Sequence, residues 1–353
     1  MLLRRHVFSA LGAAMLLSAP GVATPPRFEV THGAETGAMP KGVTVSHDGR
    51  TLYVANYGQL DRRNVTLHDA LTLREIGHID LPGIAVETAL SRDGRTLFVS
   101  NFRRNSVQFV DLARRVVTRE VAAGRHPKIV VTSPDGARLF AANWADQSVT
   151  EIDVAEARSV RQYAVGANPR GMAVSRQGTL FVANFGGASI DVFEGPGRRS
   201  HRRWEHVCAV PRHLALSPDE RRLYVTCLTA SELLTLDART GAVLGRDAVG
   251  RSPKAVAVLP GGRYVVTADY GGSSVSVVDT AMHRVQRLDV PGMDHASGIA
   301  AAPHGLRFYA TGWYDDHVYA VGLEGLGPRF RVSPRVEART REARRFHDAH
   351  PAE

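Results

Sequence analysis

The segment Leu52-Tyr53-Val54-Ala55-Asn56-Tyr57 returns six more times along the chain, and this repetition decides the fold. Close copies stand at 97–102, 139–144 and 180–185, and weaker copies at 223–228, 265–270 and 308–313. The fifth residue of each copy, here called the anchor, falls at positions 56, 101, 143, 184, 227, 269 and 312. Successive anchors are therefore 45, 42, 41, 43, 42 and 43 residues apart. A period near 42 with no helical pattern is typical of a four-stranded propeller blade.

Each repeat also contains the parts of a four-stranded sheet. In the third repeat, an apolar stretch at 129–132 precedes a Ser-Pro-Asp-Gly turn at 133–136, and a second strand ends at the anchor. Two further strands are expected at 148–153 and 160–165. Asp-Gly supplies the positive φ angle that a tight hairpin needs. We therefore predict an all-β fold, a seven-bladed β-propeller of four-stranded antiparallel blades.

The seventh repeat lacks a fourth strand in the repeat register. The segment 27–31 precedes the first repeat, where a fourth strand belongs, and the rival candidate is 329–332. A closed ring removes exposed sheet edges. We predict that the N-terminal strand closes the last blade.

The first 23 residues have the pattern of an export signal. Arg4 and Arg5 precede an apolar stretch at 7–19, and small residues at 21–23 predict cleavage before Thr24. The Arg pair also resembles a weak twin-arginine signal. We predict a signal peptide at 1–23, a propeller at 24–328 and a polar, Arg-rich tail at 329–353. The protein is expected to be periplasmic or secreted, monomeric, and without a membrane span, because no apolar run reaches 18 residues.

Basic residues recur where the innermost strand of a blade begins. The chain carries 44 Lys and Arg against 35 Asp and Glu, yet only three of the cations are Lys. A Pro at 40, 127, 169, 211 and 253 is followed by a cation, namely Lys41, Lys128, Arg170, Arg212 and Lys254, so every Lys shares this register. The five side chains are expected to converge beside the central channel, together with His213.

Such a convergence is unfavourable unless something compensates it. Two like charges ~10 Å apart repel by roughly 0.4–1.7 kcal/mol for an effective dielectric constant of 80 to 20. Either each cation pairs with a loop acid or extends along its blade, or the channel mouth binds an anion. The ligand would be an anionic small molecule or an acidic protein surface, with nucleic acid as a weaker possibility.

Aromatic residues directly follow six of the anchors, on the same face of the ring as the cations. They serve either as wedges between blades or as stacking platforms for a ring-shaped ligand. These residues are Tyr57, Phe102, Trp144, Phe185, Tyr270 and Trp313. A second basic cluster at 198–204 is expected in a solvated loop on the opposite face.

The two cysteines fall at equivalent ends of adjacent strands. Cys208 replaces the Gly that precedes the inner strand in other repeats, and Cys227 replaces the anchor Asn. Because these strands are antiparallel, both residues are expected on one face of the fifth blade. In an exported protein, this geometry predicts a Cys208–Cys227 disulfide.

The repeated Tyr-Val-Ala-Asn segment, the Ser-Pro-Asp-Gly turn and the strand ending in Asp resemble the YVTN-type seven-bladed propellers. The segments 182–187 and 211–215 also resemble motifs of the propeller lactonase and cycloisomerase family. That resemblance implies that Arg212 works with a Glu after the anchor and with a His from the preceding blade. Here the Glu position holds Leu228, and no His occurs in 168–172.

Other signatures of catalysis and metal binding are missing from the sequence. It contains no Gly-x-Ser-x-Gly elbow, phosphate-binding loop, paired-Cys motif or His-x-x-x-His zinc helix. One group of polar residues is either a metal site or a set of ordinary surface side chains; it consists of Asp294, Asp315, Asp316 and His317. We predict no catalytic residues, no metal and no cofactor. The preferred function is an exported, non-catalytic binding protein; the alternatives are a lactonase-like hydrolase or isomerase and an accessory protein of a periplasmic cofactor or redox system.

Overall fold

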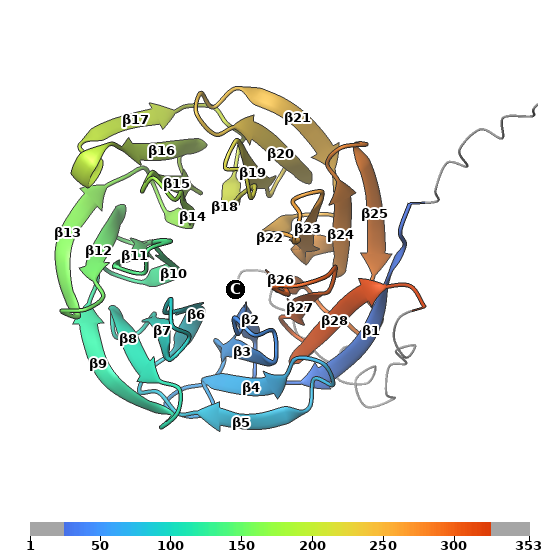
Figure 1. The fold of residues 1–353 in the computed structure, drawn as a ribbon, viewed down its shortest axis with the longest axis horizontal. Coiled ribbons are helices and arrows are strands. Elements are labelled where there is room, and N and C mark those ends of the chain that lie inside the picture. The colour runs from blue at the N-terminus through green and yellow to red at the C-terminus, as the bar shows by residue number, and fades with distance from the viewer. Residues whose placement is uncertain (1–24, 326–353) are drawn as a thin grey trace, which may run out of the picture.

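The structure, a computed structural model, describes residues 25–325. The predicted export signal at 1–23 and the tail at 329–353 lie outside these residues, as does the rival closing strand at 329–332. Seven four-stranded antiparallel sheets surround a central axis in the described part of the chain (Figure 1). The predicted seven-bladed propeller is therefore confirmed.

The blades follow one another around the ring in sequence order. Within each blade, the first strand named below lies nearest the axis and the last lies at the outer edge. Blade 1 is β2 (Pro40–Val45), β3 (Thr51–Asn56), β4 (Val65–Asp69) and β5 (Glu75–Ile79). Blade 2 is β6 (Ala85–Leu90), β7 (Thr96–Asn101), β8 (Ser106–Asp111) and β9 (Val116–Ala122). Blade 3 is β10 (Pro127–Thr132), β11 (Arg138–Asn143), β12 (Ser148–Asp153) and β13 (Arg158–Ala164). Blade 4 is β14 (Pro169–Val174), β15 (Leu180–Asn184), β16 (Ser189–Glu194) and β17 (Ser200–Trp204), with the short 3-10 helix η1 (Pro196–Arg198) between the last two.

The remaining blades follow the same plan. Blade 5 is β18 (Pro211–Leu216), β19 (Arg222–Cys227), β20 (Glu232–Asp237) and β21 (Val243–Ala248). Blade 6 is β22 (Pro253–Val258), β23 (Tyr264–Asp269), β24 (Ser274–Asp279) and β25 (Arg284–Asp289), with η2 (Tyr270–Gly272) after β23. Blade 7 is β26 (Ala296–Ala301), β27 (Phe308–Gly312), β28 (His317–Leu323) and β1 (Phe28–Glu35).

The N-terminal strand closes the ring, as predicted. β1 pairs antiparallel with β28 from Phe28 opposite Leu323 to Glu35 opposite His317, and is longer than the expected segment 27–31. Gln286 of blade 6 also holds this strand, since its side chain accepts a hydrogen bond from Phe28 N and donates one to Phe28 O, both at 3.0 Å. The first and last described strands therefore lie side by side in Figure 1.

The hydrophobic core lies mainly between blades. One cluster, for example, joins Phe140 and Tyr163 of blade 3 to Met172 and Leu180 of blade 4. Each blade alone exposes apolar faces that only its neighbours can cover, which explains why the repeats fold as a closed set. The described residues contain no helix long and apolar enough to cross a membrane.

The anchors explain why the repeated motif ends in Asn. In blades 3 and 4, the side-chain amide of Asn143 or Asn184 donates hydrogen bonds to polar side chains of the third strand. The Gly before the inner strand, such as Gly124 or Gly166, lies directly against the anchor, and a Cβ there would overlap it. The pair of Gly and anchor Asn thus forms one tight unit at the start of each such blade.

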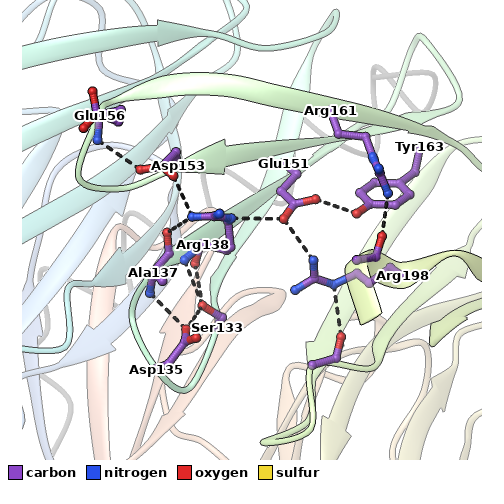
Figure 2. A network of polar contacts seen from close by, with 12 residues as sticks. Ser133, Asp135, Ala137, Arg138, Glu151, Asp153, Glu156, Arg161, Tyr163 and Arg198 are labelled. Atoms are coloured by element: carbon purple, nitrogen blue, oxygen red, sulfur yellow. Dashed lines mark hydrogen bonds and ion pairs between the residues drawn. The ribbon is translucent and has the colours of Figure 1, made fainter. Parts of the chain in front are cut away.

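The basic cluster at 198–204 differs from its prediction as a solvated loop. Most of it forms the outer strand β17, and its Arg203 binds the buried carboxylate of Asp191 at 2.7 Å. Arg198 inserts between blades 3 and 4, where its Nη1 lies 2.9 Å from Oε1 of the buried Glu151 (Figure 2). Tyr163 donates a hydrogen bond to the other oxygen of Glu151 at 2.5 Å. Arg198 and Arg203 therefore have structural partners, as is usual for charged groups that are partly buried.

Candidate functional site

The predicted cations start the innermost strands, at the face of the ring where the anchors lie. Each is the second residue of its strand in blades 1, 3, 4, 5 and 6. The structure brings four of the five, with His213, around one narrow cavity of about 40 Å³. We call Lys41, Lys128, Arg170, Arg212 and Lys254 the cation cluster. Lys128 does not line this cavity; its ammonium lies among aromatic rings instead.

Three members of the cation cluster are buried, the other two are partly exposed, and the cluster has few hydrogen-bonding partners. Lys41 and Arg212 are each 7% exposed, and Lys254 is 9% exposed. Arg212 donates one hydrogen bond to the backbone oxygen of Lys254 at 2.8 Å. Among the described residues, Lys41 Nζ and Arg170 Nε have no hydrogen-bonding partner. Polar groups buried without partners are uncommon, and they often mark places where a ligand or water binds.

Burial and mutual repulsion disfavour the charged forms of these groups. Burial lowers the pKa of Lys41 and of Lys254 well below their usual range, and neighbouring cations lower both further. Burial, with Arg170 and Arg212, lowers the pKa of Lys128 to about 7. Burial also lowers the pKa of Arg170 to about 10. The surroundings of these basic groups therefore supply too little negative charge to favour their protonated forms.

Glu87 is the site residue that the sequence analysis missed. It lines the cavity and is the only acid in the seven inner strands, all of which lie within the described residues. Gly42 makes room for its carboxylate, because a Cβ on Gly42 would overlap Glu87 Oε1. Burial raises the pKa of Glu87 to about 7, against the attraction of Lys41. An available signal was that Glu87 is the single acidic residue in seven otherwise similar strands.

His213 lines the same cavity as a neutral side chain. Its Nδ1 accepts a hydrogen bond from Val256 N at 3.2 Å, so the neutral ring carries its proton on Nε2. Burial, reinforced by Arg212, lowers the pKa of His213 to about 4. At neutral pH this residue adds a hydrogen-bond donor to the cavity and no charge.

The aromatic residues after the anchors lie beside the cation cluster, and several of their rings contact one another. In each blade, the backbone N–H of the residue after the anchor donates a hydrogen bond to the backbone oxygen of the residue directly before the inner strand; Tyr57, Phe102 and Leu228 are examples. We call Tyr57, Phe102, Trp144, Phe185, Leu228, Tyr270 and Trp313 the collar, in which Leu228 takes the place of blade 5. All seven are partly exposed.

The collar rings lie against the cations. Lys128 Nζ is 4.1 Å from the ring centre of Phe102 and 5.6 Å from those of Tyr57 and Trp144. Lys254 Nζ is 4.0 Å from the ring centre of Tyr270 and 4.4 Å from that of Trp313. Cation–π attraction of this kind partly offsets the loss of water around each cation.

Blade 5 differs from the other blades beside Arg212. Cys208 and Cys227 are joined by a disulfide, with Cα atoms 6.1 Å apart. The bridge takes the place of the contact between Gly and anchor Asn seen in blades 3 and 4. A covalent link thus fixes the start of the strand that carries Arg212 and His213.

The polar residues Asp294, Asp315, Asp316 and His317 are mostly buried and do not form a surface patch. Asp294 and Asp315 are each 1% exposed, and Asp315 accepts hydrogen bonds from Tyr319 and from Asp294 N. Asp316 accepts a hydrogen bond from Met39 N of the first blade, which ties the ring together. Burial raises the pKa of Asp315 to about 7. Within residues 25–325, no group of three His, Cys, Asp or Glu side chains has the geometry to hold a metal ion.

The fold and the cation cluster define a seven-bladed propeller with a basic central cavity. A family model described as "Lactonase, 7-bladed beta-propeller" matches residues 210–305, which include Arg212 and His213 but make up less than a third of the 353 residues. No protein of curated function matches the sequence.

Similar solved structures support the fold. Hydrazine synthase from Kuenenia stuttgartiensis is 21% identical with a TM-score of 0.71, covering 81% of this chain and 96% of that one. Virginiamycin B lyase from Staphylococcus aureus is 13% identical with a TM-score of 0.71, covering 84% and 100%. The β-propeller domain of Cps50 (Swd1) from Myceliophteria thermophila is 16% identical with a TM-score of 0.71, covering 84% and 99%. At these identities the likeness concerns the fold alone.

Proposed function

We propose that this chain is a binding protein that holds a small anionic ligand in its central cavity. The observation that carries the proposal is the imbalance of ionisable residues in the inner strands, which contain five basic side chains and one acidic side chain, Glu87. Lys41 strengthens it, because its buried ammonium has no hydrogen-bonding partner among the described residues. A bound anion would supply the missing hydrogen bonds and reduce the repulsion between the cations.

The shape of the site favours a compact ligand. A cavity of about 40 Å³ has room for a carboxylate, a phosphate or a few water molecules. Four of the five cations line this small cavity, whereas an acidic protein surface or a nucleic acid needs cations spread over an accessible face. A carboxylate or phosphate group on a small molecule is therefore the preferred ligand.

Calorimetry and thermal unfolding test this proposal directly. Phosphate, sulfate and a dicarboxylate are titrated into the folded protein at low ionic strength, with sodium chloride as the ionic-strength control. Hydrogen bonds to charged groups contribute about 1.5–3 kcal/mol, so Lys41→Met is expected to weaken binding by roughly 10–150-fold. Arg103→Met, at an exposed position in the turn after Phe102, is the matched control. The proposal fails if none of these anions raises the unfolding temperature more than chloride does.

A lactonase-like activity is the second candidate function. It is favoured by the family-model match and by Glu87, which faces the same cavity as Arg212 and His213. A carboxyl group with a pKa of about 7 is suited to proton transfer at neutral pH, a role that Leu228 cannot perform. Lactone hydrolysis followed by pH-stat decides the point, since turnover should occur and be lost in Glu87→Gln. Absence of turnover, or equal turnover in the variant, excludes this candidate.

We further propose that the protein is an exported, monomeric member of the YVTN-type propellers. The Arg-containing signal pattern at 1–23, the repeated motif and the disulfide support this assignment, because disulfides persist in oxidising compartments. The mass of the protein isolated from its producing cell should correspond to cleavage before Thr24. The third candidate, an accessory role in a cofactor or redox system, predicts an absorbance band in that material.

A further inference from the structure

Lysine occurs in the cation cluster and nowhere else in the chain. Of 44 basic residues, 41 are Arg, and the three Lys are all members of the cation cluster. A guanidinium remains charged at any physiological pH, whereas a buried ammonium loses its proton readily and then becomes a nucleophile. Among side chains, the amines that can react therefore occur only in this basic register.

Lys128 is the lysine best placed for such chemistry. Lys41 and Lys254 are 7% and 9% exposed, whereas Lys128 is partly exposed at the collar. Its Nζ lies within 5.6 Å of three ring centres contributed by blades 1, 2 and 3, which replace part of its water shell. Within residues 25–325, no carboxylate forms an ion pair with it.

The charged neighbours of Lys128 also favour reactivity. Arg170 and Arg212 repel its proton and, with burial, lower its pKa to about 7. The same two guanidinium groups are suited to hold a carboxylate or phosphate of an incoming molecule. An amine beside fixed cations in an apolar setting is a known arrangement for activating lysine toward carbonyl compounds.

We propose that Lys128 captures a small anionic aldehyde or ketone, such as a 2-oxo acid, as a reversible imine. The amine lone pair adds to the carbonyl carbon to form a carbinolamine. This intermediate loses water, which takes the carbonyl oxygen and both amine protons, and leaves a carbon–nitrogen double bond. The reaction is balanced without an oxidant or reductant. The inference rests on the proposed anion site, because Arg170 and Arg212 line that cavity and are also the charged groups that act on Lys128.

Glyoxylate, a small anionic aldehyde, is the probe, and propionaldehyde is its neutral counterpart. Each is incubated with the full chain at pH 7 and cyanoborohydride, which fixes any imine for peptide mapping. An ordinary lysine with a pKa near 10.4 is only about one part in 2,500 deprotonated at pH 7, so Lys128 should be labelled at least ~10-fold faster in the folded chain than in urea. Glyoxylate should also label Lys128 faster than propionaldehyde does, and phosphate should slow the labelling by glyoxylate.

The outcomes separate this inference from the proposed anion site. If phosphate binds by calorimetry but Lys128 reacts more slowly in the folded chain than in urea, the anion site stands and the nucleophile is excluded. If labelling is fast but equal for both aldehydes and unaffected by phosphate, an anionic substrate is excluded. Lys128→Met should remove the adduct from that peptide, and Arg103→Met should leave labelling unchanged. The mapping of the unmodified chain alone is decisive if a variant fails to fold.

Discussion

Replacing Lys128 by Met should stabilise the folded protein, and the gain should depend on pH. The pKa of Lys128 is about 7 in the folded state and 10.5 in an unperturbed lysine. Between these values the unfolded chain binds more protons than the folded one, so stability increases as pH rises. The penalty for burying this group is about 5 kcal/mol at pH 6 and about 2 kcal/mol at pH 9, from 1.36 kcal/mol per pKa unit.

Urea unfolding of both proteins at pH 6 and pH 9 measures this difference. Lys128→Met should exceed the wild type in unfolding free energy, and its advantage should be about 2–3 kcal/mol larger at pH 6 than at pH 9. Packing differences between Met and Lys do not depend on pH, so they cancel in the comparison. Arg103→Met is the control, because an exposed guanidinium does not titrate in this range. An equal advantage at the two pH values would refute the reasoning.

Three further predictions concern the scaffold. Unfolded, unreduced protein should contain no free thiol, and replacing both cysteines by Ser should lower the unfolding free energy by about 3 kcal/mol; two free thiols per chain would contradict the bridge. Arg198→Met should lower the unfolding free energy by about 2–4 kcal/mol, because it leaves the buried Glu151 with weaker compensation, and a loss below about 0.5 kcal/mol would show that the Arg198–Glu151 ion pair is unimportant for stability. Gln286→Ala should cost about 1–3 kcal/mol in urea unfolding by removing both hydrogen bonds to Phe28, whereas the exposed neighbour Arg287→Ala should be nearly neutral.

The fold was predictable because the same pattern of strands and turns occurs in all seven repeats. Anchors such as Asn143 mark where the second strand ends, and the missing fourth strand of the seventh repeat points to the segment before the first. Sequence spacing also placed Cys208 near Cys227, since antiparallel strands bring these two ends together. The repeated strands, turns and anchors therefore determine the propeller scaffold.

The site was predictable only as far as it follows the repeat. Lys41 and Arg212 share a register, so their convergence could be expected. Glu87 could not be found in this way, because it occurs in one blade and its room depends on Gly42 from another. Asp315 and Arg198 were expected near the surface because charged residues usually are, yet each has buried partners contributed by distant segments.

The cavity is not sevenfold symmetric, because its acidic and basic residues come from different blades. Glu87 comes from blade 2, next to Lys41 of blade 1, while Arg170, Arg212 and Lys254 come from blades 4, 5 and 6. A ligand with an anionic end toward the three cations would place its other end near Glu87, where a hydrogen-bond donor is favoured if the carboxylate is ionised. The pKa of Glu87 is raised to about 7. Below pH 7 the carboxyl group is therefore mostly protonated and can also donate a hydrogen bond to an acceptor on the ligand. Ligands that carry both a carboxylate and a hydroxyl or amine should therefore bind more tightly above pH 7 than simple anions of equal charge.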